Sequence, residues 1–309
     1  MLRHGAIGLA AAVLALGFVL AGTGAEDGEL PRAASGTGPT SGTASPGMPR
    51  ATGPSALAAA RRISRGIGSR PAGGRNERRA HRYVARQFRA AGLEVSIRRF
   101  RVPGPGRSRN VIGALEGRAR CLHLLMAHTD SVPPGPGAND NASGVGVLVA
   151  LAHRLRSAPP ACDLWLVATG AEERPVTGTG YHVGAAALVR TLKRSGRARD
   201  LRFALSVDMV GRGKRFSLRS PRRSARRGVE RPILAAARRA RVKLRWMRDS
   251  GQGNSDHREF ELAGLPAAVI QVWRGRDRCH HEGCDRPGRL QKRSLNRVQR
   301  VLQRLVEAG

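Results

Sequence analysis

Ionisable side chains follow four apolar runs of this 309-residue chain, and each run has the length and composition of a buried strand. In an open α/β sheet, ligands bind outside the carboxyl ends of the strands, so we expect these side chains to converge at one edge. They are His128 and Asp130 after the run 122–127, Glu172 and Glu173 after 164–168, Asp208 after 203–207, and His280 and His281 after 267–272.

A glycine-rich loop, residues 137–144, adds a further carboxylate to this set. The loop opens a helix, and Asp140 lies near the helix start, where backbone donors favour a negative charge. Simple capping is one interpretation of Asp140. The other is that its carboxylate reaches inward and shares its two oxygens between cations.

Histidines and carboxylates together form a nitrogen and oxygen ligand set suited to zinc, with cobalt or manganese as alternatives. Two such ions about 3.5–4 Å apart can share one carboxylate and one water. A nearby glutamate that binds no metal can then take a proton from that water. Serine catalysis is a poor rival, because the sequence has no Gly-x-Ser-x-Gly motif.

The elements that position these groups follow from the apolar periodicity. Helical spacing predicts two leading helices at 56–65 and 76–91, and strands follow at 95–102 and 110–115. Apolar strands then alternate with helices, which predicts an α/β fold with a mainly parallel, mixed central sheet covered by helices on both faces. The later helices are expected at 143–155, 181–193, 229–240 and 294–306.

The N-terminal region has the composition of an exported protein. Residues 1–25 have the basic start, apolar middle and small-residue end of a secretory signal peptide. An uncleaved membrane anchor is the alternative, because the apolar stretch approaches the roughly 17-residue lower limit of a span. Residues 26–55 are rich in Gly, Ser, Thr and Pro and predict a disordered linker, which leaves 56–309 as the catalytic domain.

The formal net charge is +33, from 55 Lys and Arg against 22 Asp and Glu. Such a charge attracts polyanions or an acidic cell envelope. The arginines are spread along the chain without the interleaved aromatic residues of single-strand binding, so we expect no specific nucleic-acid partner. Solvated arginine faces are the simpler interpretation, and we expect a monomer that acts on peptides.

Four cysteines in an exported chain indicate disulfides. Cys121 and Cys162 each open an apolar run and would lie level if the two strands are neighbours. Cys279 and Cys284 would close a small loop. We predict these two pairs, although four cysteines allow three connectivities.

The motifs resemble, in order, the signature of the co-catalytic zinc exopeptidases, which include secreted bacterial aminopeptidases, plasma glutamate carboxypeptidase and glutaminyl cyclase. The resemblance covers about residues 56–307, and the ordered set is far more specific than any one motif. The motifs are His128-Thr-Asp130, Gly137-Ala-Asn-Asp140-Asn-Ala-Ser-Gly144, Glu172-Glu173, Ser206-Val-Asp208-Met209, Ser255-Asp256-His257, and His281 four residues before Asp285.

The resemblance implies a role for each matching residue. His128 and Asp208 would bind one zinc, Glu173 and His281 the other, and Asp140 would bridge the two. Glu172 would be the general base, and Asp130 would orient His128, whose ring donates its other proton. The implied activity is that of a secreted aminopeptidase that hydrolyses N-terminal residues through a hydroxide between the two ions.

Several alternatives stay open at this level. His281 is followed by Glu-Gly-Cys where the family commonly has Thr-Pro, and His280 is an alternative ligand. Asp256 and His257 are assigned as site-lining groups, with helix capping as the other interpretation. Arginines at 274, 276 and 278 would favour a carboxypeptidase or dipeptidase if they hold a substrate carboxylate. Glutaminyl cyclase activity and a non-catalytic polyanion-binding module are the remaining alternatives.

Overall fold

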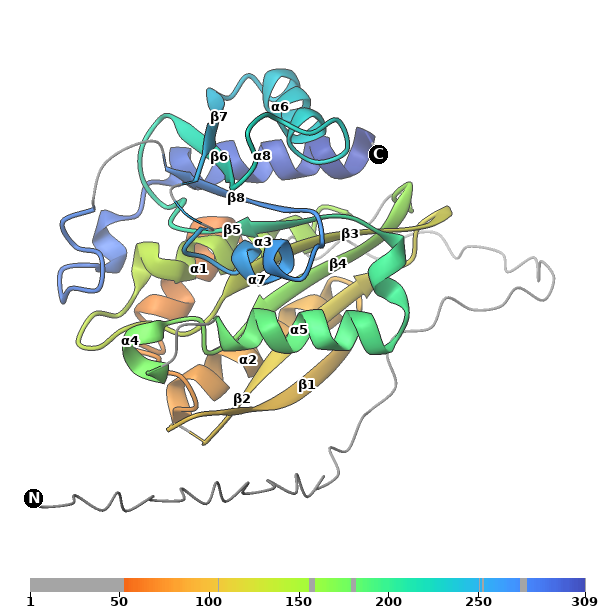
Figure 1. Ribbon diagram of the computed structural model, residues 1–309. Helices are drawn as coiled ribbons and strands as arrows, with labels where there is room; N and C mark the ends of the chain where they lie inside the picture. Colours follow the sequence, from red (N-terminus) through yellow and green to blue (C-terminus); the bar gives the residue numbers. More distant parts are fainter. Residues whose placement is uncertain are drawn as a thin grey trace, which may run out of the picture.

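The computed structural model describes residues 53–104, 106–155, 159–178, 182–249, 251, 253–272 and 277–308. Within these residues, one 8-stranded sheet forms the centre of the molecule (Figure 1). Its strands are β1 (Glu94–Val102), β2 (Gly106–Leu115), β3 (Ala119–His128), β4 (Cys162–Thr169), β5 (Leu201–Val207), β6 (Phe216–Ser220), β7 (Leu244–Arg248) and β8 (Ala267–Val272).

The strand order is β1-β2-β4-β3-β5-β8-β6-β7. The four central strands, β4, β3, β5 and β8, are parallel to one another. The flanking strands β2 and β6 run antiparallel to them. At the two ends of the sheet, β1 pairs antiparallel with β2, and β7 pairs parallel with β6. The predicted α/β fold with a mainly parallel, mixed sheet is therefore confirmed, and the carboxyl ends of the central strands share one edge.

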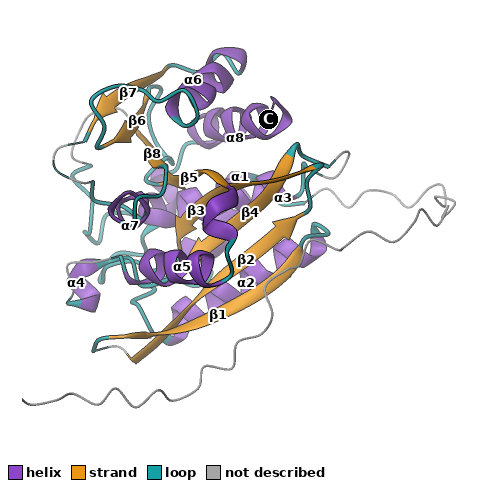
Figure 2. Ribbon diagram, turned by 45° about the vertical axis from the view of Figure 1, so that its right-hand side comes forward, coloured by secondary structure: helices purple, strands orange, loops and turns teal. Residues whose placement is uncertain are grey.

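Helices cover both faces of the sheet (Figure 2). Successive side chains of a strand point to opposite faces, so Leu125 and Ala127 pack on one side while Leu124 and Met126 pack on the other. Burial on both sides explains the continuous apolar runs. The helices are α1 (Ala56–Ser64), α2 (Arg75–Ala90), α3 (Ser143–Ala152), α4 (Arg174–Thr177), α5 (Val183–Arg194), α6 (Glu230–Arg239), α7 (His257–Leu262) and α8 (Lys292–Ala308).

Local chemistry accounts for several helix ends. The hydroxyl of Ser55 accepts a hydrogen bond from the amide of Ala58 and caps α1. Gly92, at φ 82°, follows α2 in a conformation that glycine adopts without strain. The helix predicted to reach residue 155 ends at Ala152, and the one predicted from 181 begins at Val183. Residue 181 lies outside the described residues.

Four elements were not predicted, namely α4, α7, β6 and β7. Strand β7 lies at the edge of the sheet, and its residues are only partly buried. Its mixed pattern therefore carries little apolar signal. Helix α7 has six residues, and α4 has four, so neither is long enough to show helical periodicity.

The predicted signal peptide and most of the predicted linker lie outside the described residues, and those boundaries stay predictions. No helix in the described part of the chain has the length and apolar character of a membrane span.

Close packing of α1 on α3 gives a prediction about stability. A Cβ atom at Gly146 would lie 2.5 Å from the carbonyl oxygen of Ala56 and 2.9 Å from Cβ of Ala60. Alanine favours a helix by about 1 kcal/mol over glycine, but overpacking costs about 1–3 kcal/mol. We expect Gly146→Ala to lower the free energy of unfolding by about 1–2 kcal/mol in chemical denaturation. Gly228→Ala, where an added Cβ meets no atom within 4 Å, is the control; equal stability of the two variants would contradict the packing argument.

Candidate metal centre

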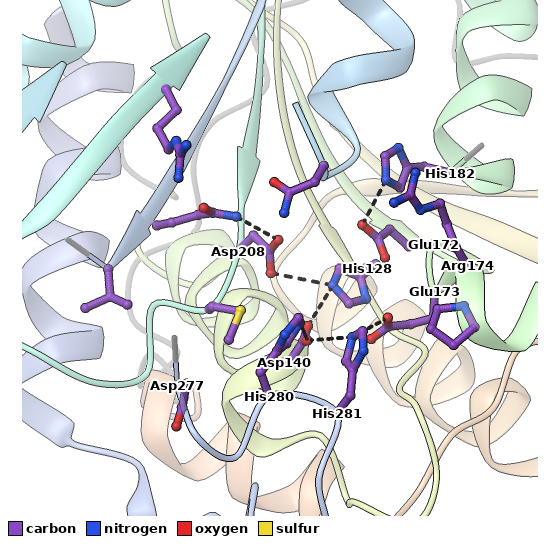
Figure 3. A pocket seen from close by; sticks show the side chains of 16 residues that line it. His128, Asp140, Glu172, Glu173, Arg174, His182, Asp208, Asp277, His280 and His281 are labelled. Atoms are coloured by element: carbon purple, nitrogen blue, oxygen red, sulfur yellow. Dashed lines mark hydrogen bonds and ion pairs between the residues drawn. The ribbon is translucent and has the colours of Figure 1, made fainter. Parts of the chain in front are cut away.

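The polar groups predicted to converge do meet at the carboxyl edge of the central strands. Strand β3 ends at His128, Glu172 and Glu173 follow β4, and Asp208 follows β5. Together with His281, from the segment after β8, these side chains line one cavity of about 700 Å³. Figure 3 shows them directed toward one another.

Asp140 lies between two groups of ligating atoms. Its Oδ1 is 3.1 Å from Nε2 of His128, which is also 3.5 Å from Oδ1 of Asp208. Its Oδ2 is 3.4 Å from Nε2 of His281, which is 2.9 Å from Oε2 of Glu173. The five side chains predicted as metal ligands are thus brought together, and the two oxygens of Asp140 face different histidines.

The donor atoms fit a metal site. The buried atoms Oε1 of Glu173 and Oδ1 of Asp208 have no hydrogen-bond partner among the described residues. Three overlapping sets of side chains place one ligand atom each within 4.8 Å of the others. Nitrogen and oxygen donors at this spacing suit zinc. The sets are His128 with Asp140 and Glu173, His128 with Glu172 and Asp208, and Asp140 with His280 and His281.

The pKa values of the clustered carboxylates reflect burial, neighbouring negative charge and hydrogen bonds from histidines. Burial raises the pKa of Glu172 well above its ordinary value, and the neighbouring charge of Glu173 adds to the effect. Burial and the charge of Asp140 raise the pKa of Glu173 to about 7. At Asp140 burial is outweighed by hydrogen bonds from His128 and the two later histidines, and the pKa falls well below its ordinary value. A cation among these carboxylates would relieve their repulsion.

The two adjacent histidines both reach Asp140. Nε2 of His280 lies 3.1 Å from Oδ2 of Asp140, and the two imidazole rings lie 3.8 Å apart. His281 alone of the two also contacts Glu173. Its side chain is 29% exposed against 45% for His280. These contacts favour His281 over His280 as the ligand.

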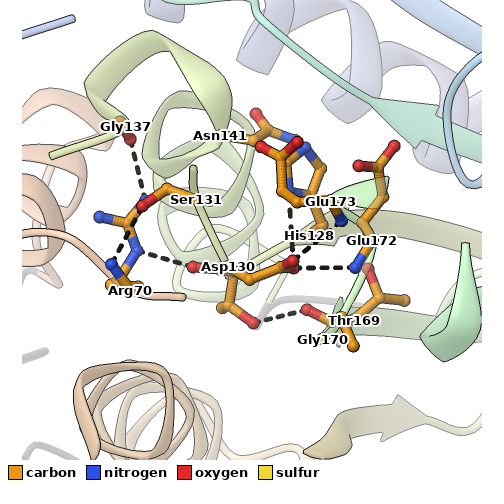
Figure 4. Close-up of polar contacts among 12 residues, drawn as sticks. Arg70, His128, Asp130, Ser131, Gly137, Asn141, Thr169, Gly170, Glu172 and Glu173 are labelled. Carbon is orange, nitrogen blue, oxygen red and sulfur yellow. Dashed lines mark hydrogen bonds and ion pairs between the residues drawn. The ribbon is translucent and has the colours of Figure 1, made fainter. Parts of the chain in front are cut away.

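Asp130, predicted to orient His128, makes its shortest contacts elsewhere. Its Oδ1 is 3.7 Å from Nδ1 of His128, which is too long for a hydrogen bond. The carboxylate instead accepts hydrogen bonds of 3.1 and 3.0 Å from the backbone amides of Glu172 and Glu173 (Figure 4). Asp130 therefore positions the glutamate pair as well as facing the imidazole.

A second buried carboxyl group, which the sequence did not reveal, holds the same turn. Oε1 of Glu77 accepts hydrogen bonds from the amide of Ala171 and the hydroxyl of Ser108. Ala171 has a φ of 55°, a strained value for a residue with a Cβ. Burial and the nearby charge of Asp130 raise the pKa of Glu77 to about 8. Glu77 thus stabilises the turn that presents the glutamate pair.

Arg70, also missed in the sequence, is a fully buried cation beneath the cluster. Its Nε donates to the carbonyl of Thr129 at 2.6 Å, and its Nη2 donates to the carbonyl of Gly137 at 2.9 Å (Figure 4). These bonds tie the segment after His128 to the loop before Asp140. Burial lowers its pKa to about 10, so the guanidinium stays charged at neutral pH.

The C-terminal loop is held in two ways. The carboxylate of Asp285 accepts hydrogen bonds from the amides of Asn139 and Asp140, at 2.8 and 3.0 Å. A disulfide joins Cys279 to Cys284 and encloses both loop histidines. The other disulfide joins the first residue of β4 to β3, so both predicted pairs, Cys121–Cys162 and Cys279–Cys284, are confirmed.

Asp256 and His257 do not line the cavity, contrary to their assignment as site-lining groups. Both side chains are fully buried. Asp256 occupies the N-cap position of α7, but its side chain accepts a hydrogen bond from the hydroxyl of Thr169 and makes no cap bond. The hydroxyl of Ser255 contacts that of Ser206 instead, so the alternative of side-chain capping by Ser255 and Asp256 is wrong as well. Asn254 lines the cavity instead.

Of the three arginines that could hold a substrate carboxylate after β8, the structure describes only Arg278. Residues 274 and 276 lie outside the described residues. Arg278 is exposed, and it is not among the residues that line the cavity.

A buried histidine contacts the predicted general base. Nε2 of His182 lies 3.4 Å from Oε1 of Glu172, and its Nδ1 lies 3.3 Å from Oε1 of Glu259 on α7. Figure 3 shows the imidazole beside Glu172, on the side away from Asp140. His182 is 1% exposed, so its ring has a fixed place. The contact restrains one oxygen of Glu172.

The fold and this cluster define a two-histidine, three-carboxylate site at the edge of an α/β sheet. The chain belongs to peptidase family M28, whose model matches residues 110–306. The predicted resemblance is therefore confirmed.

The curated relatives include several aminopeptidases. Aminopeptidase YwaD of Bacillus subtilis is 34% identical over 153 residues, which cover 48% of this chain and 31% of YwaD. Leupeptin-inactivating enzyme 1 of Streptomyces exfoliatus is 26% identical over 236 residues, covering 70% of this chain and 51% of the relative. The chain thus spans about half or less of the length of these relatives.

Solved structures share the fold at low identity. The zinc aminopeptidase BSAP from Bacillus subtilis superimposes with a TM-score of 0.71 at 17% identity, covering 82% of this chain and 94% of that one. The Bacteroides thetaiotaomicron glutaminyl cyclase bound to N-acetylhistamine has a TM-score of 0.70 at 21% identity, covering 83% and 99%. The predicted fold class agrees with both.

The contact between His182 and Glu172 gives a kinetic prediction. We expect His182→Gln to lower kcat on an amino-acid anilide on the order of 10–100-fold, because a misplaced base loses part of its effect. KM and metal content should change little, since His182 belongs to none of the three sets of side chains that could hold a metal ion. His123→Gln is the control: His123 is buried, stacks on Phe203 and lies near the opposite edge of the sheet. An equal loss of kcat in both variants would contradict the positioning role.

Proposed function

We propose that this protein is a secreted, zinc-dependent aminopeptidase that removes N-terminal residues from peptides. The observation that carries the proposal is the position of Asp140, whose two oxygens face two separate histidine and carboxylate pairs. His128 and Asp208 would hold one zinc, and Glu173 and His281 the other. Membership of family M28 and the aminopeptidase relatives support this assignment.

When bound, the zinc pair would supply Lewis-acid activation of the attacking water and of the scissile carbonyl. Glu172 would take a proton from the water as it attacks the carbonyl carbon, and it would pass that proton to the leaving amine when the C–N bond breaks. The products are the free N-terminal amino acid and a peptide shortened by one residue. Asp130 and Glu77 would keep the turn that bears Glu172 in place throughout.

The buried carboxylates also support the choice of an aminopeptidase. The cavity contains the carboxylate of Glu172, which is not one of the five proposed zinc ligands. This carboxylate can accept a hydrogen bond from a free α-amino group, so the substrate's amino end would bind close to the reacting bond. Two disulfides in the described chain support an exported protein, in agreement with the predicted signal peptide.

The first test compares substrates. We expect hydrolysis of an unblocked amino-acid anilide that a chelator abolishes and added zinc restores. Cleavage of an N-blocked dipeptide alone would indicate a carboxypeptidase or dipeptidase. Cyclisation of an N-terminal glutamine without hydrolysis would indicate a glutaminyl cyclase, and the Bacteroides thetaiotaomicron enzyme of that kind has the same fold. A chain inactive on all three substrates that binds polyanions with a steep salt dependence would indicate the non-catalytic module.

The second prediction separates metal binding from proton transfer. We expect Glu172→Gln to keep the zinc content of the parent protein and to lose about 10²–10⁴-fold in kcat, because the amide cannot accept a proton. Glu116→Gln, at an exposed position, is the control. Full activity of Glu172→Gln would show that the assigned mechanism is wrong.

The third prediction concerns Asp140. We expect Asp140→Ala to lose zinc, measured by elemental analysis after gel filtration, because its carboxylate faces both predicted metal positions. Asp163→Ala is the control, because Asp163 is also an aspartate with little exposure but pairs with Arg197 outside the cavity. Retention of zinc at the parental stoichiometry in Asp140→Ala would exclude a bridging role.

A further inference from the structure

One wall of the cavity is polar and comes from residues outside the proposed metal ligands. It consists of Arg219 on β6, Gln271 on β8 and Asn254 in the segment before α7. We refer to these three residues as the polar wall. Apolar and aromatic side chains predominate in most ligand pockets, so a wall of this composition indicates a polar group on the substrate.

Strand register places the polar wall beside the metal centre. Ser217 of β6 pairs with Gln271 of β8, and Arg219 lies two residues farther along β6, on the same face of the sheet as its paired residue Val269. The amide of Gln271 donates to Oδ2 of Asp208 at 3.2 Å. Arg219 therefore lies on the strand next to Gln271 and on the same face of the sheet, two positions farther along β6. Gln271 in turn contacts the proposed zinc ligand Asp208.

Arg219 is held in place from behind. Its Nε lies 2.8 Å from Oδ1 of Asp249, a carboxylate that is 5% exposed. The other oxygen of Asp249 lies 2.9 Å from Nε2 of the buried His257. Asp249 is the only carboxylate paired with Arg219 in the part of the chain that the structure describes. The side chain is 31% exposed, so the guanidinium is anchored at one edge and accessible elsewhere.

An anchored, partly exposed arginine is suited to bind a carboxylate. The planar guanidinium presents parallel N–H donors that match the two oxygens of a carboxylate, and anchoring reduces the entropy lost on binding. The amides of Asn254 and Gln271 can add hydrogen bonds without opposing charge. The polar wall thus differs from the side of the cavity where Glu172 and Glu173 lie together with Arg174.

We propose that the polar wall binds a carboxylate group of the peptide substrate; this inference rests on the proposed aminopeptidase function and specifies its substrates. The carboxylate has two sources, the side chain of an acidic N-terminal residue and the free C-terminus of a short peptide. In a dipeptide, either carboxylate belongs to one of the two residues that flank the scissile bond.

Two matched substrate pairs test the inference and distinguish the sources. The first pair, Glu-anilide and Gln-anilide, compares the γ-carboxylate of a glutamate side chain with its amide. The second pair, Leu-Gly and Leu-Gly-amide, compares a free C-terminal carboxylate with its amide. We expect kcat/KM to favour the charged member of one pair on the order of 10–100-fold, as for a charge-assisted hydrogen bond. The pair that shows the preference identifies the source.

Arg219→Gln should abolish that preference, measured as the ratio of kcat/KM within the pair, with hydrolysis of Leu-anilide recorded as the reference for each variant. Arg222→Gln is the control, because Arg222 also pairs with a carboxylate, that of Glu261, but does not line this cavity. Equal kcat/KM within both pairs for the parent protein, or a preference that survives in Arg219→Gln, would overturn the inference.

A binding measurement tests the polar wall independently of whether the protein hydrolyses peptides. Calorimetry on zinc-loaded Glu172→Gln compares the same four compounds, with and without Arg219→Gln. Tighter binding of a charged member that depends on Arg219 supports the polar wall even if no substrate is cleaved. Equal affinities overturn it even if the protein proves to be an aminopeptidase.

Discussion

Burial of four carboxylates in one cavity, close enough to repel one another, is the constraint on which this site depends. Asp140, Glu172, Glu173 and Asp208 are each at most 6% exposed and share one cavity. The chain as a whole carries a net charge of +33, so this local excess of acid is opposite in sign to the rest of the molecule. Divalent cations would offset the repulsion, and the unpartnered oxygens of Glu173 and Asp208 are placed to bind them.

Not every buried acid is placed to bind a cation. Asp130, Glu77 and Asp285 use their carboxylates to accept backbone N–H groups of the segments that present the cluster. Arg70 does the complementary work by donating to backbone carbonyls. Backbone held from both sides gives the donor atoms fixed positions, which matters because a metal site needs its ligands within a few tenths of an ångström.

The fold itself does not determine the reaction. Zinc aminopeptidases and glutaminyl cyclases both superimpose on this chain over about four-fifths of its length. The side chains that bear on the reaction lie around the carboxyl edge of the central strands, and they include His182 beside Glu172 and the polar wall anchored by Asp249. Function therefore has to be argued from these side chains.

The amino-acid sequence by itself predicted the central strands and the side chains that meet at their carboxyl edge. Continuous apolar runs mark strands buried on both faces, and a polar residue just after such a run, as at His128 and Asp208, must lie at the carboxyl edge. The disulfide pairs followed from similar reasoning, since Cys121 and Cys162 open neighbouring strands. These features are local or depend only on strand order, so they can be read along the chain.

Only the tertiary structure decided which distant groups surround that set. Arg70, Glu77 and His182 come from segments whose pattern resembles any half-buried helix or loop. Their contacts with Thr129, Ala171 and Glu259 join positions 59 or more apart in the chain. Arg219 acquires its place from the register of β6 on β8, in an outer part of the sheet that the sequence pattern did not show. Side-chain partners across such separations depend on packing and register, which a single sequence does not specify.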